Sequence, residues 1–426
     1  MNVANYPALG MQVMRKTLPS GLRICVVPMP GFTKKVAYLM TDFGAIHTDY
    51  SLQGEQKSLP AGIAHYLEHK LFDMPENRDI TAEFAALGAS VNAFTSYDMT
   101  AYHFSCTEHF EENLSLLLEF VTLPYFTPQS VEKEQGIIAQ EIGMNLDAPD
   151  MRVFENLMKI LYKNHPVRVP ILGTVESIGQ ITAQVLTDCH NAVYRPENMF
   201  LCVLGDVDAD TVAALAEKFF PENHTAVPVR VDRWQEEMAC ICPYIEETME
   251  VSMPMFQLGF KCEPLPKGQE ALHREIVGEL AAEWLFGESS ELYLRLYEEG
   301  LIDSSFGGGY ETVEDMAMLS CGGDSKDPEA VQEAILRQAQ KLLSEGLEEA
   351  DFLRMKRSAM GRRIRGLDSF DSTAFRLCAY HGMGVDYFRF PEAYQAVEKE
   401  ELVTFLRQTV TRQRMALSVI NPCKED

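Results

Sequence analysis

The sequence lacks the long apolar runs of membrane-spanning helices. No stretch of its 426 residues approaches the roughly 18 consecutive apolar residues that such a helix needs. The first 21 residues, MNVANYPALGMQVMRKTLPSG, also lack the basic start and continuous apolar core of a secretory signal. We therefore expect a cytoplasmic protein with no membrane partner.

Basic residues are scarce, with 37 Lys and Arg against 63 Asp and Glu, which gives a formal net charge of −26. Phosphate backbones are bound by clustered Lys and Arg, so the composition excludes a nucleic-acid partner. It also disfavours binding to anionic lipid. Two interpretations of the acidity remain: it keeps a large protein in solution, or it attracts basic peptides.

The ten cysteines lack the paired spacing of a structural zinc site. Cys240 and Cys242 form the one close pair, with a single residue between them, whereas a zinc ribbon needs two pairs with wider internal spacing. Scattered cysteines in a long cytoplasmic chain are usually reduced and structural. We assign them no function.

A break in the pattern divides the chain into two parts. Residues 223–245 contain two prolines and show no sustained periodicity, which is typical of a linker. Hydrophobic residues make up 46% and charged residues 23%, as in ordinary folded domains. We predict an N-terminal domain over 1–225, a linker over 226–245 and a C-terminal domain over 246–426.

The expected elements recur in the same order on both sides of this linker. The first part contains strands at 16–29, 36–45, 90–106 and 197–206, and helices at 63–73, 79–88, 108–122 and 128–146. The second begins with a strand at 255–262, continues with helices, among them 328–345 and 348–366, and closes with a strand at 414–421. This recurrence predicts an α+β fold of two repeated α/β-roll halves, each an antiparallel-rich sheet with helices on one face. A clam-shell cleft between the halves would be a favoured place for a ligand.

The pentapeptide His65-Tyr-Leu-Glu68-His69 carries the clearest chemical signal. On a helix of about 100° per residue, His65 and His69 lie within roughly 40° of one another, with Glu68 beside them. Two imidazoles one turn apart can ligate one zinc ion, and the glutamate can deprotonate a water molecule there. The order is the inverse of the H-E-x-x-H zinc motif and is itself a zinc-peptidase signature. Because five residues can match by chance, the motif requires a third ligand.

The predicted helix at 128–146 offers that ligand. Glu134 and Glu141 are seven residues apart, so they share one helix face with Ile137 and Ile138 between them. Carboxylates on a partly apolar face are unfavourable unless a cation meets them, and zinc would be such a cation. The alternative is a solvated acidic face on which Glu132 also points outward. This segment alone leaves both interpretations open.

Five segments together resemble the pitrilysin, insulysin and mitochondrial processing peptidase family of zinc metallopeptidases, and most of all its bacterial YmfH-type members. They are GIAHYLEHKLF (62–72), GASVNAFTSYDMTAYHF (88–104), EKEQGIIAQEIGMNLD (132–147), HPVRVPILGTVESI (165–178) and YRPENMFLCVLGDVD (194–208). The second half matches in layout more than in residues.

The resemblance implies a zinc endopeptidase with one Zn²⁺ per chain. In it His65, His69 and Glu141 bind the metal, Glu68 is the general base, and Glu134 supports the site from behind the ligands. The resemblance also places Asn92 and Ala93 on an edge strand where a peptide substrate lies as an added strand.

One part of the second half departs from the family. Active members contribute an arginine and a tyrosine there, and SSELYLRLYEEGLIDSS (289–305) places Tyr297 and Asp303 at those two positions. Arg295 is turned by about 200° from Tyr297 on a helix, so we expect it in a surface salt bridge. An oxyanion donor contributes about 2.7–4 kcal/mol to transition-state stabilisation, so the loss should matter.

Two explanations of this departure are open. A related partner subunit, in a homo- or hetero-dimer, supplies the missing pair, or the chain binds zinc and cleaves slowly alone. The first is preferred, because in a two-subunit enzyme one chain can carry the complete metal motif while its partner supplies the residues that the second half lacks. The alternative function is a non-catalytic scaffold or assembly subunit on the same fold.

Overall fold

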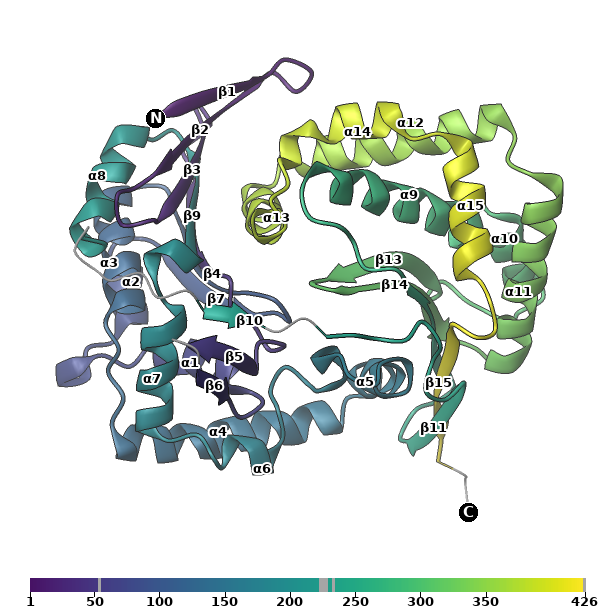
Figure 1. Ribbon diagram of the computed structural model, residues 1–426, viewed down its shortest axis with the longest axis horizontal. Coiled ribbons are helices and arrows are strands. Elements are labelled where there is room, and N and C mark those ends of the chain that lie inside the picture. The colour runs from purple at the N-terminus through teal and green to yellow at the C-terminus, as the bar shows by residue number, and fades with distance from the viewer. Residues whose placement is uncertain (53–54, 222–228, 232–233, 424–426) are drawn as a thin grey trace. The chain divides into compact units, whose positions relative to one another are not determined.

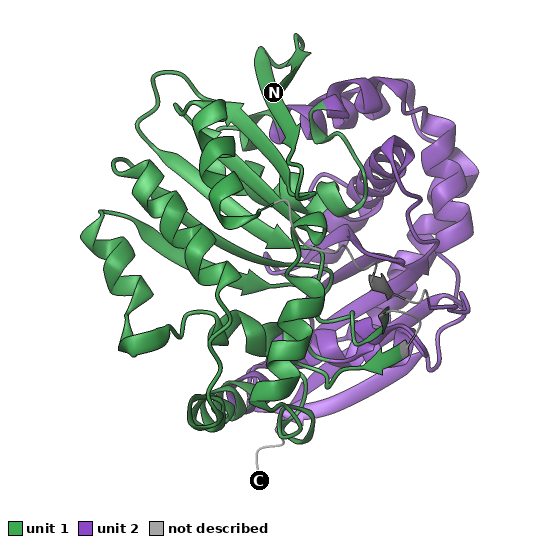
Figure 2. Cartoon of the chain, turned by 60° about the vertical axis from the view of Figure 1, so that its left-hand side comes forward, with its two compact units in different colours: residues 1–142, 170–232, 364–388 green, residues 143–169, 233–363, 389–426 purple. Residues whose placement is uncertain are grey.

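The computed structural model describes residues 1–52, 55–221, 229–231 and 234–423 (Figure 1). Two compact units interleave along the chain, where the sequence predicts two consecutive halves (Figure 2). Unit 1 contains Met1–Ile142, Pro170–Asp232 and Ile364–Phe388, and unit 2 contains Gly143–Val169, Arg233–Arg363 and Arg389–Asp426. Each unit thus includes one helical segment from the other part of the chain.

The main sheet of unit 1 has seven strands in the order β1-β2-β3-β9-β4-β8-β7. The strands are β1 (Asn2–Tyr6), β2 (Met11–Thr17), β3 (Arg23–Pro28), β4 (Lys35–Thr41), β7 (Ser90–Thr95), β8 (Thr100–Cys106) and β9 (Met199–Gly205). Only β3 and β9 pair in parallel; the other neighbours are antiparallel. The sheet is therefore antiparallel-rich, and β7 forms one of its edges.

Alternate residues of the strands face two different helical layers. Leu39 of β4 and Leu201 of β9 belong to the hydrophobic core that also contains residues of α1 (Ile63–Lys70), α3 (Phe110–Thr122) and α8 (Ala209–Phe219). Their neighbours Tyr38 and Phe200 point to the opposite face, as side chains in a strand alternate. There they meet α13 (Phe370–Gly382). The prediction of helices on one face is thus incomplete for unit 1.

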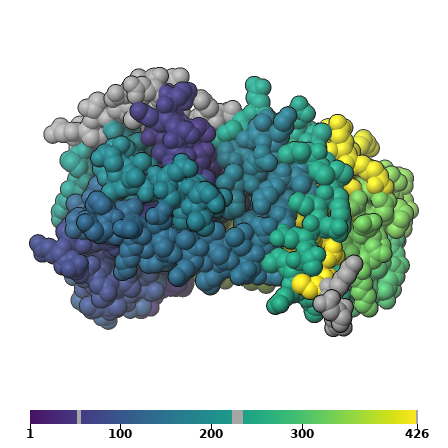
Figure 3. All heavy atoms as spheres, turned by 90° about the horizontal axis from the view of Figure 1, so that it is seen from below, coloured from purple at the N-terminus to yellow at the C-terminus, as the bar shows by residue number. Residues whose placement is uncertain are grey.

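The remaining elements of unit 1 complete its outer layer. They are α2 (Ile80–Ala86), α4 (Pro128–Leu146), α6 (Val175–Ile178), α7 (Ala183–Val193) and a small sheet of β5 (Asp49–Leu52), β6 (Glu55–Ser58) and β10 (Val229–Val231), in the order β10-β5-β6. The last residues of α4 belong to unit 2. Figure 3 views the molecule from below, the side on which α4 lies in Figure 1.

Unit 2 is built on a five-stranded sheet in the order β11-β15-β12-β14-β13. Its strands are β11 (Tyr244–Met249), β12 (Met255–Cys262), β13 (Gly307–Val313), β14 (Met316–Asp324) and β15 (Met415–Pro422). Its helices are α5 (Pro149–Leu161), α9 (Gln269–Phe286), α10 (Glu291–Glu298), α11 (Pro328–Glu345), α12 (Glu349–Gly366), α14 (Phe390–Ala396) and α15 (Lys399–Thr409). The predicted α+β fold of two related halves is confirmed. No helix in the described ranges is long and apolar enough to cross a membrane.

Helix α5 packs closely on β12 because Gly259 has no side chain. A Cβ atom there would lie 2.8 Å from Leu161 Cδ1 and 3.1 Å from Leu157 Cδ2. Just after α5, Tyr162 donates a hydrogen bond to the carbonyl of Ala317 on β14 (3.1 Å). A helix from the first half of the sequence is thus part of the core of unit 2.

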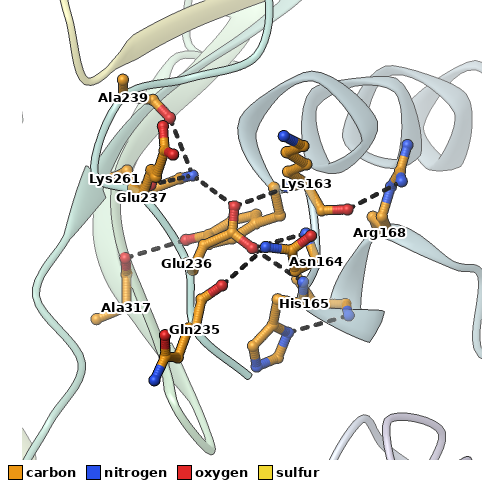
Figure 4. Close-up of polar contacts among 12 residues, drawn as sticks. Lys163, Asn164, His165, Arg168, Gln235, Glu236, Glu237, Ala239, Lys261 and Ala317 are labelled. Atoms are coloured by element: carbon orange, nitrogen blue, oxygen red, sulfur yellow. Dashed lines mark hydrogen bonds and ion pairs between the residues drawn. The ribbon is translucent and has the colours of Figure 1, made fainter. Parts of the chain in front are cut away.

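Glu236 holds the segment before β11 against the end of α5 (Figure 4). Its carboxylate accepts hydrogen bonds from the backbone N–H groups of Lys163 (2.7 Å), Asn164 (2.7 Å) and His165 (3.0 Å). Lys261 Nζ lies 3.2 Å from the same carboxylate, and the two side chains are 2% and 11% exposed. This is a buried ion pair whose carboxylate also satisfies three backbone donors.

Glu236→Gln is expected to lower the free energy of unfolding by about 3–5 kcal/mol, because it leaves the Lys261 charge buried without its counter-charge. Urea denaturation measures the effect. Glu237→Gln changes an exposed neighbour and should stay within about 0.5 kcal/mol of the native protein. Equal effects of the two substitutions would contradict this role.

The same contribution should depend on pH. Burial acts to raise the pKa of Glu236, but the backbone donors of residues 163–165 and Lys261 lower it on balance. A lowered folded-state pKa gives stability that is present above the unfolded value of about 4.3 and is lost as pH falls through the folded value. The difference between the native protein and Glu236→Gln should therefore shrink below about pH 4.

Candidate metal centre

Helix α1 places His65, Glu68 and His69 at the surface of the unit 1 core. It begins after Gly62, whose φ of 90° is left-handed, and a Cβ atom there would lie 2.3 Å from the carbonyl oxygen of Leu172. Tyr66 and Leu67 are fully buried, so packing fixes the rotation of the helix. The histidines and Glu68 then point away from that core toward α4 and β7.

Helix α4 supplies the two carboxylates that face these histidines. Glu134 is 15% and Glu141 is 39% exposed at the side chain, and both approach histidine nitrogens, whereas Glu132 is exposed. Ile138, between them, is fully buried, and Ile137 is 43% exposed. The two carboxylates therefore belong to a built site rather than to a solvated acidic face.

One ligand atom from each of His65, His69 and Glu141 lies within 4.8 Å of the others. The two oxygens of Glu141 are each 3.7 Å from one histidine Nε2. Ligand atoms around a tetrahedral zinc ion with bonds of about 2.0–2.1 Å are separated by about 3.3 Å. Three protein ligands of this kind are also the number found in catalytic zinc sites. The residues fit the metal that the sequence predicts.

Glu134 orients His69 by contacting its Nδ1, the ring nitrogen that does not face Glu141. Its Oε1 lies 3.0 Å from His69 Nδ1, and this hydrogen bond is the main cause of the raised pKa of His69 and of the lowered pKa of Glu134. With Nδ1–H donating to Glu134, the lone pair on Nε2 faces Glu141. A carboxylate behind a histidine ligand is the usual arrangement in zinc sites.

His65 is oriented by packing instead. It is 7% exposed, and its buried Nδ1 has no hydrogen-bond partner among the residues that the structure describes. Burial, and then the neighbouring His69, lower the pKa of His65 to about 4. The imidazole is therefore neutral at physiological pH, which is the form that binds a metal.

Glu68 stands beside the ligands without being one of them. Its Oε2 accepts a hydrogen bond from Thr95 Oγ1 at 2.6 Å, and burial raises the pKa of its carboxyl group although the Thr95 hydrogen bond acts against this. A carboxylate with a raised pKa is a stronger base, as general catalysis requires. Thr95 lies outside the zinc motif of the sequence, and its place on β7, two residues after Ala93, is the one signal that points to it.

Thr95→Val should lower kcat for peptide cleavage by about tenfold without changing zinc content, because Glu68 loses the hydrogen bond that positions its carboxylate. Thr95→Ser keeps the hydroxyl and should restore most of the rate. Steady-state kinetics of the three proteins check this. A rise in KM with an unchanged kcat would contradict a positioning role.

Glu134→Gln should weaken zinc binding by about 10–100-fold, the usual effect of removing a carboxylate behind a histidine ligand. The three ligands remain, so the metal is still bound when zinc is in excess. Competition with a chromogenic chelator measures the affinity. Glu132→Gln on the outer side of α4 is the control, and an equal loss in both variants would count against the role of Glu134.

Asn92 and Ala93 lie on β7, whose only described sheet neighbour is β8. Asn92 is exposed, and its side-chain oxygen accepts a hydrogen bond from the N–H of Ala93 (2.9 Å). Since β7 ends the sheet, its outer edge has the form that accepts an added strand. Their role in substrate binding stays a prediction.

Tyr297 and Asp303 belong to unit 2, where each has a local partner. Tyr297 is 52% exposed and stacks on Tyr293 with ring centroids 5.9 Å apart. Asp303 accepts a hydrogen bond from the N–H of Ser305 (2.8 Å). The salt bridge expected for Arg295 is not found: within the described ranges Arg295 forms no ion pair, and its Nη2 is buried without a partner.

Two family models match the chain in succession. The model described as insulinase, peptidase family M16, matches residues 54–175, which contain the whole candidate metal centre. The model described as the peptidase M16 inactive domain matches residues 180–359.

One curated relative matches over nearly the whole chain, and another over most of it. The zinc protease YmfH of Bacillus subtilis, itself uncharacterised, is 34% identical over 98% of this chain and 98% of its own. The chain belongs to the M16 peptidase family. Another relative, the uncharacterised zinc protease YmxG of Bacillus subtilis, is 26% identical over 85% of this chain and 87% of its own.

Solved structures share the fold of this chain. An M16-like peptidase from Alicyclobacillus acidocaldarius has a TM-score of 0.93 at 30% identity and covers 97% of this chain and 99% of its own. A protease from Helicobacter pylori has a TM-score of 0.83 at 20% identity, covering 96% and 99%. A chain of complex III2 from Candida albicans, at 14% identity and a TM-score of 0.76, covers 96% and 95% and shares the fold.

Proposed function

We propose that the chain is a zinc metalloendopeptidase that hydrolyses peptide bonds in peptides or unfolded polypeptides. The observation that carries the proposal is the group His65, His69 and Glu141 with Glu68 beside it. Membership of the M16 family and the zinc protease names of its relatives support the same activity.

The chain's own residues supply the proton transfers. Zinc held by three protein ligands provides Lewis-acid activation of water and of a peptide carbonyl. Glu68 accepts the proton of the attacking water, since its raised pKa makes it a competent base. It then returns this proton to the nitrogen of the leaving amine. Thr95 holds the carboxylate throughout by its hydrogen bond.

The substrate would add as a strand to the outer edge of β7, beside Asn92 and Ala93. Hydrogen bonds between main chains do not depend on side-chain identity, so this mode suits a peptidase of broad specificity. Thr95 lies at the end of the same strand and contacts Glu68. A peptide on this edge would therefore run toward the general base.

The chain would act with a related subunit, as a homo- or hetero-dimer, that grips the substrate. Tyr297 and Asp303 stand where active relatives are expected to have an arginine and a tyrosine, and such a pair contributes to transition-state stabilisation. The cytoplasmic location expected from the sequence stays a prediction.

Metal analysis together with cleavage of a fluorogenic peptide library tests the proposal. We expect about one zinc ion per chain and metal-dependent cleavage that rises when a related subunit encoded by the same organism is added. A protein without zinc, or zinc-loaded protein without cleavage under both conditions, would contradict it. The second outcome would favour the alternative, a non-catalytic scaffold or assembly subunit.

A further inference from the structure

Unit 1 has a recess away from the metal centre, on the face of its sheet that α13 covers. The pocket has a volume of about 260 Å³ and is lined by residues of β1, β2, β3 and β9 and of the segment 377–387. Its lining includes Thr17 of β2, Cys25 of β3 and His381 of α13, so it lies at the junction of these three elements. None of the residues of the metal centre lines it.

The charged side chains that line this pocket are basic. They are Arg15, Lys16 and Arg23, and no lining residue in the described part of the chain is Asp or Glu. Lys16 follows Arg15 on β2, so its side chain faces the other side of the sheet, where its Nζ lies 2.9 Å from a carboxylate oxygen of Glu217 of α8. Arg15 and Arg23 are therefore the two cations on the α13 side of the recess.

Each of the two arginines has a carboxylate partner but uses only part of its donor set within the protein. Arg15 Nη2 contacts Asp386 at 3.0 Å, and Arg23 Nη2 contacts Asp42 at 3.1 Å. A guanidinium group has five N–H donors, so these contacts leave donors over. The carboxylates hold the arginines in place without lining the pocket.

Two buried nitrogens of the lining residues have no hydrogen-bond partner. They are Arg23 Nε and His381 Nε2, and the statement covers the residues that the structure describes. Burying a polar group without a hydrogen-bond partner is unfavourable. Such groups in a native protein often have an ion or a water molecule as their partner. The imidazole of His381 stacks on Phe200 with centroids 3.9 Å apart and ring planes 9° apart, so its nitrogens are held in a fixed plane.

The positive charges of Arg23 and Arg15 near His381 also favour an anion there. Burial, followed by Arg23 and Arg15, lowers the pKa of His381 to about 3. The imidazole is thus neutral and can donate one hydrogen bond. An anion between these groups would offset the repulsion among them.

We propose that this pocket binds a phosphate group, held by Arg15, Arg23 and His381. Guanidinium forks match phosphate oxygens, and the N–H donors that Arg15 and Arg23 leave over would meet those oxygens. The group could come from free phosphate or from a small phosphate monoester. A bound phosphate would link β2 and β3 to α13, which joins unit 1 from a distant part of the chain. The proposal does not depend on the metal centre.

Calorimetric titration and thermal melting of the full-length protein test this proposal at constant ionic strength. The ligands are inorganic phosphate, glycerol 3-phosphate and succinate. We expect saturable binding with one site per chain and a rise in Tm for at least one of the two phosphate ligands. Tighter binding of glycerol 3-phosphate would identify a monoester as the source, and tighter binding of phosphate would identify the free ion.

Four variants show where the ligand binds. Arg23→Met should weaken it at least tenfold and Arg15→Gln several-fold, the second at a side chain that is 38% exposed. Lys218→Gln, at an exposed lysine of α8, should leave it unchanged, and so should Glu141→Gln in the metal centre. Absence of saturable binding, preference for succinate, or undiminished binding by both pocket variants would overturn the proposal. Loss of binding in Glu141→Gln would place the phosphate on the zinc site instead and would equally overturn it.

Discussion

Glu68→Gln is expected to abolish peptide cleavage while zinc remains bound at about one ion per chain. The amide cannot accept the proton of the attacking water, and a general base contributes about 10²–10⁴-fold to the rate. The amide keeps the size of the side chain and its hydrogen bond from Thr95, so the fold and the three metal ligands should be unaffected. A loss of at least about 10³-fold in kcat/KM is predicted, measured with a fluorogenic peptide at equal zinc content.

The matched control for this experiment is Glu132→Gln. It makes the same chemical change on an exposed residue of α4, close in sequence to Glu134 but turned away from the histidines. Its activity should equal that of the native protein. Cleavage that survives in Glu68→Gln would remove this carboxylate from the mechanism.

His69→Asn is expected to reduce the zinc content from about one ion per chain to nearly none, and to abolish cleavage with it. In the proposed centre His69 is one of three zinc ligands, and Glu134 contacts its Nδ1. The variant would therefore lose one ligand, and Glu134 could no longer support the site through that histidine. Inductively coupled plasma mass spectrometry of the purified protein measures the change. His109→Asn is the control, since that histidine is 54% exposed and asparagine tolerates its φ of 52°.

Metal removal should give a consistent result in melting experiments. A ligand that binds only the folded state stabilises it by about 4.1 kcal/mol at a thousand times its Kd. A chelator should therefore lower the Tm of the native protein and leave that of His69→Asn almost unchanged. An equal shift of both proteins would mean that the stabilising metal is bound elsewhere.

Local patterns were enough to predict the elements that build the metal centre. The helix predicted at 128–146 is found as Pro128–Leu146, and the seven-residue spacing of Glu134 and Glu141 places both on the face that meets α1. His65, Glu68 and His69 likewise share one side of a short helix. Helical periodicity depends on residues close in sequence, so it can be read from the chain alone.

Features that depend on distant residues could not be predicted in the same way. Helix α13 belongs to unit 1 because Tyr38 and Phe200 present a surface for it, and nothing near residues 370–382 indicates this. Thr95 contacts Glu68 only because the edge strand β7 ends beside α1. Sequence spacing also gives no reason to expect that Arg295 forms no ion pair with any residue that the structure describes.

The phosphate pocket shows the same limit. Arg15 and Arg23 are separated by the turn between β2 and β3, and His381 lies more than 350 residues further along the sequence. Their grouping follows from the pairing of β2 with β3 and from the packing of α13. The net charge is a sum over the entire chain, so it gives no information about basic side chains gathered at one place.

The most direct test of the metal centre is anomalous X-ray diffraction from crystals of the purified protein, recorded on both sides of the zinc absorption edge. One peak is predicted, at about 2.0–2.2 Å from His65 Nε2, His69 Nε2 and a Glu141 oxygen. A peak at any other position, or zinc-replete crystals with no peak between these three residues, would contradict the account.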